Sequence, residues 1–316
     1  NKKLVKKIAV KGISQTGSTG TEGYVYLEGI NLFKDKNPTA QLGFEIKQLS
    51  GLKTVVRQVN VGDNLYEKSG NLEEYKDRFV ITNIDGRDNS LTFQNGLKIY
   101  AGDVKGSVNE DQLRRIQIRE TILSHIDRER QLFLKGIKVL SLFFIDEVAK
   151  YKEYDATGTA YNGLYAEMFI EEYDEIIGNL QLQFGEETYV EYLKSIETNT
   201  THAGYFSIDK KKNQLVDSKI ERGTKESNDV DAYDLIMKDK ERLLDFREPV
   251  RFIFSHSALK EGWDNPNVFQ ICTLKQSTAE TRKRQEVGRG LRLCVNNEGD
   301  RMDVSVLGEE VHYINQ

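Results

Sequence analysis

The stretch that decides the fold reads Arg251-Phe-Ile-Phe-Ser-His-Ser-Ala-Leu-Lys-Glu-Gly-Trp-Asp-Asn-Pro-Asn-Val268, and Gln285-Glu-Val-Gly-Arg-Gly-Leu-Arg292 follows it. Arg251–Phe254 and Phe269–Leu274 are apolar runs of strand length. Between the second run and Gln285, Ser277-Thr-Ala-Glu280 is a capping-box pattern that predicts the start of a helix. The order is therefore strand, loop, strand, helix. It predicts part of an α/β lobe built on a parallel sheet.

The second stretch has the form QxxGRxxR, in which two arginines are three residues apart. Residues at this spacing lie on one face of a helix, so Arg289 and Arg292 can both face one anion. A nucleotide-driven motor needs such a pair where its second lobe meets the γ-phosphate of ATP. The structural alternative is an ion pair between Asp264 and Arg289. The presence of both stretches, in this order and at this spacing, favours the phosphate interpretation.

Together the two stretches resemble motifs V and VI of superfamily-two helicases. The sequence SALKEGWDNPNVFQICTL, followed by QEVGRGLRL, is similar to that of the Res subunit of type III restriction enzymes. The resemblance covers roughly Leu113 to Val306 and is strongest from Phe252 to Leu293. It implies that this part of the chain is the second RecA-like lobe of a motor.

The resemblance also assigns roles to individual residues. Arg289 and Arg292 would reach the γ-phosphate across the cleft between two lobes, and Arg292 would be the arginine finger. Gln285 would orient the nucleotide or its attacking water. Gly262 permits a tight turn, and Asp264 can accept a hydrogen bond from ribose or from a motif VI arginine. The expected catalytic residues are Gln285, Arg289 and Arg292, and the expected nucleotide-binding residues are Gly262, Asp264, Gly288, Arg289 and Arg292.

For the full-length protein, the resemblance implies ATP hydrolysis coupled to communication along double-stranded DNA, with ATP and Mg²⁺ as cofactors. It implies a nuclease domain of the PD-(D/E)xK type and a partner, the DNA methyltransferase subunit Mod. The first RecA-like lobe of the same parent chain would hold the nucleotide. We therefore expect a cytoplasmic protein.

The sequence contains no GxxxxGK[ST] phosphate loop. The nearest string, Gly12-Ile-Ser-Gln-Thr-Gly17, lacks the lysine that the motif needs. The string Phe143-Phe-Ile-Asp-Glu-Val-Ala149 looks like an acidic metal site, but Mg²⁺ would have no phosphate to bridge there. We interpret Asp146 and Glu147 as a strand-end turn. The chain, which begins at Asn1, is thus expected to be an excised piece with half an ATP site, no metal ligands and no activity of its own.

Composition limits the class of protein. A length of 316 residues suggests two or three domains, and 30% charged residues with only 3 prolines argue against long disorder. The net charge of −5 excludes a chain that is basic throughout, although Lys275 to Arg301 is locally basic. Cys272 and Cys294 read as small core residues, which fits a reducing compartment. No apolar run approaches membrane-spanning length.

Residues 1–110 are expected to form a β-rich domain. Short apolar runs are separated by Gly, Asn and Asp, and Asp85-Gly86 and Asn95-Gly96 are hairpin signals. Strands at this spacing, without helices between them, predict a small barrel or sandwich. The domain is either a structural insert or a contact for the DNA backbone.

Residues 111–316 are expected to form the RecA-like lobe, with an insertion at about 155–248. Apolar residues at helical spacing from Leu113 to Phe133 predict a helix that ends at Gly136. The run Ile137–Ile145 predicts a strand buried on both faces. The remaining expected elements are a helix from Tyr165 to Leu180, a charged loop at Ser218–Asp229, a helix from Ala232 to Phe246 and a final strand at Asp303–Leu307.

Two other functions remain open at this point. The first is a superfamily-two DNA helicase or translocase without restriction activity, which a neighbouring methyltransferase gene would argue against. The second is a non-catalytic RecA-like module that binds nucleic acid, which ATP hydrolysis by the full-length protein would argue against.

Overall fold

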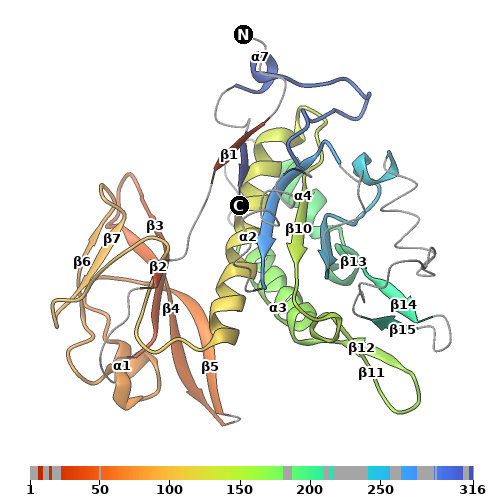
Figure 1. The fold of residues 1–316 in the computed structure, drawn as a ribbon. Coiled ribbons are helices and arrows are strands. Elements are labelled where there is room, and N and C mark those ends of the chain that lie inside the picture. The colour runs from red at the N-terminus through yellow and green to blue at the C-terminus, as the bar shows by residue number, and fades with distance from the viewer. Residues whose placement is uncertain are drawn as a thin grey trace. The chain divides into compact units, whose positions relative to one another are not determined.

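The computed structural model describes residues 6–9, 14–15, 23–49, 51–180, 187–209, 214–216, 241–256, 265–275, 288, 290–308 and 313–315. The chain divides into a β-rich unit, residues 12–113, and an α/β unit, residues 1–11 with 114–316 (Figure 1). Residues 1–11 group with the α/β unit because their strand pairs in its sheet. The β-rich domain expected from the sequence, residues 1–110, includes them, whereas they belong to the α/β unit.

The β-rich unit contains a five-stranded and a three-stranded sheet among its described residues. The five-stranded sheet has the order β2-β9-β3-β4-β5 and is antiparallel except between β2 and β9. Its strands are β2 (Ser14–Gln15), β3 (Val25–Asn31), β4 (Thr39–Gln48), β5 (Gly51–Val59) and β9 (Asp103–Lys105). The other elements are α1 (Leu65–Lys68), the 3₁₀ helix η1 (Glu73–Tyr75) and the antiparallel strands β6 (Ile81–Asp85), β7 (Ser90–Phe93) and β8 (Lys98–Tyr100).

Both sheets of this unit contribute to one apolar core. Phe44 of β4 and Phe93 of β7 belong to the same buried cluster, as alternation of apolar residues along the strands requires. Tyr75 spans the core, because its hydroxyl donates to the Tyr24 carbonyl at 2.6 Å and accepts from the Glu45 amide at 2.9 Å. The Asn95-Gly96 hairpin is confirmed, with Gly96 at φ +89° between β7 and β8.

The α/β unit is built on a parallel sheet of six strands in the order β1-β18-β17-β10-β16-β13. The central strand β10 is buried along its whole length, which confirms the predicted strand. The expected α/β class is therefore present. The strands are β1 (Lys7–Ala9), β10 (Leu140–Phe144), β13 (His202–Tyr205), β16 (Phe252–Ser255), β17 (Val268–Thr273) and β18 (Tyr313–Asn315).

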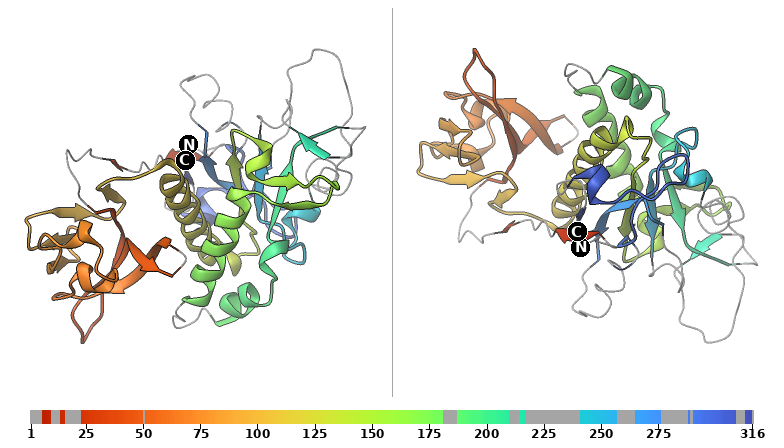
Figure 2. Two further views of the ribbon diagram at one scale, coloured as in Figure 1. Left: turned by 90° about the horizontal axis from the view of Figure 1, so that it is seen from below. Right: turned by 90° about the horizontal axis from the view of Figure 1, so that it is seen from above.

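Three helices cover one face of this sheet: α2 (Glu110–Phe133), α3 (Leu164–Gly178) and α4 (Glu187–Lys194) (Figure 2). The first turn of α2 is closed by reciprocal bonds, in which Gln112 N–H donates to Asn109 Oδ1 and Asn109 N–H donates to Gln112 Oε1. Its end is a Schellman motif, with Gly136 at φ +68°. The glycine predicted to end this helix is therefore confirmed.

Most of the remaining described elements are short: the 3₁₀ helices η2 (Val148–Lys150), η3 (Thr198–Thr200) and η4 (Arg242–Leu244), and the hairpins β11 (Lys152–Tyr154) with β12 (Ala160–Asn162) and β14 (Ser207–Asp209) with β15 (Gln214–Val216). The sequence predicts an insertion at about 155–248. In the structure, α3 and α4 from this span pack in the main core, and β13 extends the parallel sheet.

One sequence expectation is wrong. Asp303–Leu307, expected as a strand, contains the one-turn helix α7 (Val304–Leu307). The Asp303 carboxylate caps it by accepting from the Ser305 amide at 2.9 Å, and Gly308 ends it at φ +79°. The loop at Ser218–Asp229, most of the helix from Ala232 and the capping box at Ser277 lie outside the described residues.

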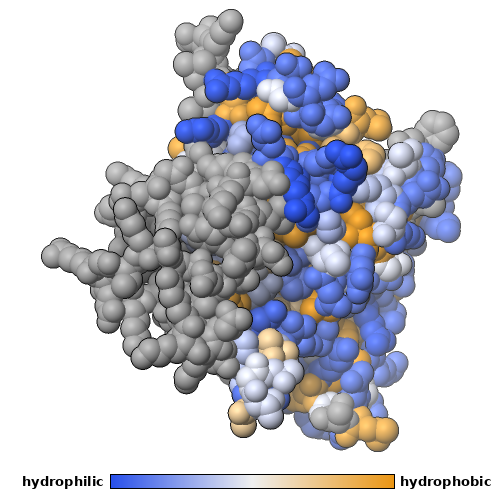
Figure 3. All heavy atoms as spheres, turned by 90° about the vertical axis from the view of Figure 1, so that its right-hand side faces the viewer, coloured by the Kyte–Doolittle hydropathy of each residue, from blue (hydrophilic) through white to orange (hydrophobic). Residues whose placement is uncertain are grey.

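Among the described residues, hydrophilic ones predominate on the face drawn in Figure 3. Within the part of the chain that the structure describes, no helix is both long and apolar enough to cross a membrane.

Candidate functional site

The first motif-like stretch lies between β16 and β17. These two strands flank β10 and run parallel to it, so Ser255 and Thr273 end at the same edge of the sheet, here called the carboxyl edge. Val268 starts β17 at the opposite, amino edge. The chain must therefore pass from one edge to the other between His256 and Asn265. Gly262 and Asp264 fall between these two residues in the sequence and lie outside the described residues.

The second motif-like stretch follows β17. Of its expected site residues, Gln285 and Arg289 lie outside the described residues, whereas Gly288 and Arg292 are described and exposed. Between them Leu291 packs against the apolar cluster on one face of the sheet. The structure therefore places the end of this stretch against the sheet, with Arg292 at the surface.

Lys6 brings the ends of the two stretches together at the amino edge. Its ammonium group donates to the carbonyl oxygens of Pro266, of Val268 at 2.9 Å and of Gly290 at 3.0 Å. Its backbone amide donates to the Leu291 carbonyl at 2.8 Å. Lys6, which directly precedes β1, thus bonds to Pro266 and Val268 at the end of the first stretch and to Gly290 and Leu291 near the end of the second. We call this group of five residues the motif junction.

Besides its three carbonyl acceptors, Lys6 has two titratable neighbours, Cys294 and Arg128. The side chain is buried, and Nζ lies 4.3 Å from the centre of the Phe269 ring. Burial lowers the pKa of Lys6 to about 7. The three carbonyl oxygens of the motif junction match the three hydrogens of an ammonium group, and they favour its charged form.

Asn267 makes a second connection at the amino edge. Its side-chain amide donates to the Val295 carbonyl at 2.9 Å, and its oxygen accepts from the Val295 amide at 2.8 Å. Its backbone carbonyl accepts from Leu140, at the start of the central strand, at 2.8 Å. The segment that follows Arg292 is therefore tied to the residues just before β17.

A buried ionic cluster lies nearby, where β16 begins. Arg251 and Glu129 are both fully buried and are 3.3 Å apart, and Arg251 also donates to the Tyr192 hydroxyl. Burial alone would raise the pKa of Glu129, but Arg251 and its other charged neighbours lower it. His125, which also faces Glu129, has its pKa lowered to about 3 by burial and is neutral. The cluster fixes Arg251, the residue that leads into the first strand of the motifs.

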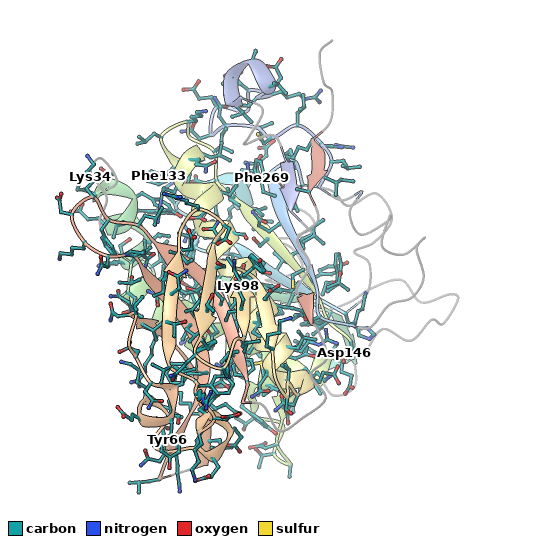
Figure 4. The ribbon with its side chains drawn as sticks, turned by 90° about the vertical axis from the view of Figure 1, so that its left-hand side faces the viewer. Lys34, Tyr66, Lys98, Phe133, Asp146 and Phe269 are labelled. Carbon is teal, nitrogen blue, oxygen red and sulfur yellow. The ribbon has the colours of Figure 1, made fainter. Side chains whose placement is uncertain are left out.

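At the carboxyl edge the ion pair between Asp146 and Lys150 is half-buried. Asp146, two residues beyond β10, pairs with Lys150 at 2.5 Å, and Lys150 lies 3.3 Å from the Tyr165 hydroxyl. Burial would lower the pKa of Lys150, but these bonds raise it. Figure 4 shows Asp146 and Phe269 toward opposite ends of the sheet. Over the described ranges, no group of three His, Cys, Asp or Glu side chains is arranged to hold a metal ion.

Sequence reasoning missed Lys6, Asn267 and the Glu129–Arg251 pair. Lys6 stands among other lysines in Lys2-Lys-Leu-Val-Lys-Lys7, so nothing marks it as buried. Asn267 did carry a signal, since an Asn directly before a buried strand needs hydrogen-bond partners. Arg251, directly before an apolar strand, carried the same kind of signal.

Comparison with known proteins identifies three relatives. The Type III restriction-modification enzyme EcoP15I Res subunit of Escherichia coli is 38% identical over 212 residues, which is 66% of this chain and 20% of that protein. The EcoPI Res subunit of Escherichia phage P1 is 38% identical over 213 residues, again 66% of this chain and 20% of that protein. The StyLTI Res subunit of Salmonella typhimurium is 29% identical over 310 residues, which is 87% of this chain and 29% of that protein.

No protein-family model matches the chain. The chain spans between 20% and 29% of the length of these relatives, all three of which are named as Res subunits. The sequence of the two motif-like stretches resembles this family, and the three relatives belong to the same family. The chain is therefore homologous to a segment of the Res subunits of type III restriction-modification enzymes.

Proposed function

We propose that the α/β unit is the second RecA-like lobe of an ATP-dependent DNA translocase and endonuclease subunit of a type III restriction system. The observation that carries the proposal is the motif junction. Two stretches that resemble motifs V and VI are connected to strands on either side of β10, and their ends meet on Lys6. A motor lobe needs these motifs held in one arrangement, because phosphoryl transfer depends on positioned charge.

In this proposal the residues act on a nucleotide that the first lobe of the full-length protein holds with Mg²⁺. Arg292 is the arginine finger, and Arg289 supplies a second positive charge to the γ-phosphate. Gln285 orients the nucleotide or its attacking water. Asp264 accepts from ribose or from a motif VI arginine. Gly262 and Gly288 let the backbone approach the nucleotide.

The proposal extends to domains and partners. Residues 12–113 form an accessory β-rich domain, and residues 1–11 with 114–316 form the motor lobe. Double-stranded DNA and a Mod methyltransferase subunit are the partners. The support is that the three relatives are named as Res subunits of restriction-modification enzymes. With the first lobe absent, the isolated chain should not hydrolyse ATP, because arginines alone do not hold the β- and γ-phosphates or Mg²⁺.

The test compares the full-length protein, purified with its Mod subunit, with the isolated chain. We expect ATP hydrolysis that DNA stimulates, and DNA cleavage that requires Mod and ATP, from the full-length complex only. Hydrolysis without Mod-dependent cleavage would instead indicate a translocase outside restriction. No hydrolysis by the complex would indicate a non-catalytic module. DNA-stimulated hydrolysis by the isolated chain would contradict the assignment of half an ATP site.

A further inference from the structure

We propose that Lys6 is a positioning residue that holds the ends of the two motif-like stretches in one arrangement and thereby places Arg292 for its action on the γ-phosphate. The inference rests on the proposed function for its last step. Its first step, the holding of the motif junction, concerns this chain alone.

The bonds of Lys6 are divided between the two stretches. Pro266 and Val268 end the first stretch, and Gly290 and Leu291 stand next to Arg289 and Arg292 in the second. The side chain bonds to both stretches, and the backbone amide adds a fourth bond to Leu291. Because all four acceptors are backbone carbonyls, Lys6 fixes the path of the chain in both stretches rather than one side-chain rotamer.

Packing alone does not account for a lysine at this position. Burying an ammonium group is unfavourable unless hydrogen bonds satisfy it, whereas methionine fills a similar volume without that penalty. A lysine with 3% exposure against the Phe269 ring is therefore explained by its three acceptors. These acceptors are far apart in sequence, and the ammonium group is what they share.

The alternative is that Lys6 only stabilises the fold, and Lys138 provides a matched control for it. Lys138 is also fully buried, and its ammonium group donates to the carbonyl oxygens of Asp245 at 3.0 Å and of Glu248. Burial lowers its pKa to about 7, as it does for Lys6. Both bonds go to residues that precede β16 and to neither motif-like stretch. Loss of either lysine should therefore reduce stability, but only Lys6 should affect the motifs.

The first experiment measures hydrogen exchange in the full-length protein without nucleotide, for Lys6→Met and Lys138→Met. The reporter is the Val295 amide, which donates to Asn267 Oδ1 next to the motif junction. We expect exchange about tenfold faster in Lys6→Met, from the loss of hydrogen bonds that hold the segment. Lys138→Met should leave it within about twofold of wild type. Unchanged exchange in Lys6→Met would overturn the holding role.

The second experiment measures steady-state ATP hydrolysis by the same proteins. In Lys6→Met we expect kcat to fall on the order of a hundredfold, because a misplaced arginine loses contacts made in the transition state. KM for ATP should stay within about threefold, since the first lobe binds the nucleotide. Lys138→Met should keep both constants. Equal loss of kcat in the two variants would mean that Lys6 only stabilises the fold, and would overturn its positioning role.

Two further outcomes remain distinguishable. If the wild-type complex does not hydrolyse ATP, the proposed function fails, while hydrogen exchange still decides whether Lys6 holds the motif junction. If Lys6→Met does not fold, Lys6→Gln serves in its place, because its amide keeps two donors. Lys6→Gln should then show a smaller but measurable loss in both experiments, and wild-type values for it would overturn the inference.

Discussion

Among the described residues, the β-rich unit buries hydroxyl and amide side chains but no charged one, whereas the α/β unit buries several charged side chains. The β-rich unit relies on apolar alternation around Phe44 and on the two bonds of the Tyr75 hydroxyl. The α/β unit adds polar connections between segments distant in sequence. Its buried charged residues are Lys6, Arg114, Arg119, Glu129, Lys138, Glu172, Glu248 and Arg251.

The difference shows what each kind of core specifies. Apolar burial is non-directional and stabilises any arrangement that removes the same area from water. A buried ammonium or carboxylate requires particular acceptors or donors, so it selects one arrangement and penalises the others. The α/β unit has such groups where β16 and β17 begin, next to the motif-like stretches. We infer that its charged core fixes geometry more than it adds stability.

The largest expected effect is on ATP turnover, and it distinguishes Arg292, within the QxxGRxxR stretch, from Arg282, which precedes that stretch. In the full-length protein, Arg292→Ala should lower ATP turnover on the order of a thousandfold, as for loss of an arginine finger. Arg289→Ala should also abolish turnover, and Arg282→Ala should be far milder, although each variant loses one positive charge. DNA binding without nucleotide should survive Arg292→Ala. Near wild-type turnover in Arg292→Ala, together with loss in Arg282→Ala, would show that motif VI is misplaced.

The second effect is on stability and tests the buried charges directly. Arg251→Met leaves Glu129 buried without its closest cation, so the α/β unit should lose about 3–5 kcal/mol of unfolding free energy. The control is Arg247→Met, which removes an exposed partner of Asp245 and should change stability far less, because water screens an exposed ion pair. Hydrogen exchange of the β10 amides reports the loss for this unit alone. Equal effects of the two substitutions would mean that burial of the pair is unimportant.

The third effect concerns the β-rich unit. Tyr75→Phe keeps the ring but removes the hydroxyl, which leaves the buried Tyr24 carbonyl and the Glu45 amide without this partner. We expect a loss of about 1–3 kcal/mol, read from exchange of the β4 amides. The β10 amides should not change, because the two units have separate cores. A loss spread over both units would contradict that separation.

The sequence predicted the elements of both units where a single segment carried the signal. The buried strand β10, the helices α2 and α3, and the turn at Gly96 all follow from local periodicity or from one glycine. The helix at Val304 was missed because the apolar alternation from Asp303 to Leu307 favours a strand. That alternation is only a few residues long, and the Asp303 cap stabilises a helical turn instead.

The motif junction could not be predicted in the same way. Lys6 and Gly290 are 284 positions apart, and hydrogen bonds to backbone carbonyls leave no trace in residue type. The Glu129–Arg251 pair is separated by 122 positions and is equally invisible to local patterns. The two motif-like stretches themselves were found because they resemble a family. Most of their expected site residues lie outside the described residues, so their roles remain proposals.

The smallest expected effect is a difference in pH dependence between the two units. Burial lowers the pKa of Lys6 and of Lys138 to about 7 in the folded chain, from 10.5 when solvated. Below pH 7 both lysines are charged in the folded and unfolded states, and the burial penalty is fully present. Between pH 7 and 10.5 the folded chain loses these protons while the unfolded chain keeps them, so stability rises with pH.

The rise should amount to about 1 kcal/mol per lysine between pH 7 and 8. Urea unfolding followed by far-UV circular dichroism measures it for the α/β unit, because α3, α4 and most of α2 belong to that unit. The double variant Lys6→Met, Lys138→Met should show a nearly flat midpoint over this range, because methionine does not titrate. The two lysines would not be the cause if the double variant kept the wild-type slope. A wild-type midpoint that does not change from pH 7 to 9 would mean that the carbonyl oxygens keep both ammonium groups charged, and that the motif junction holds across this range.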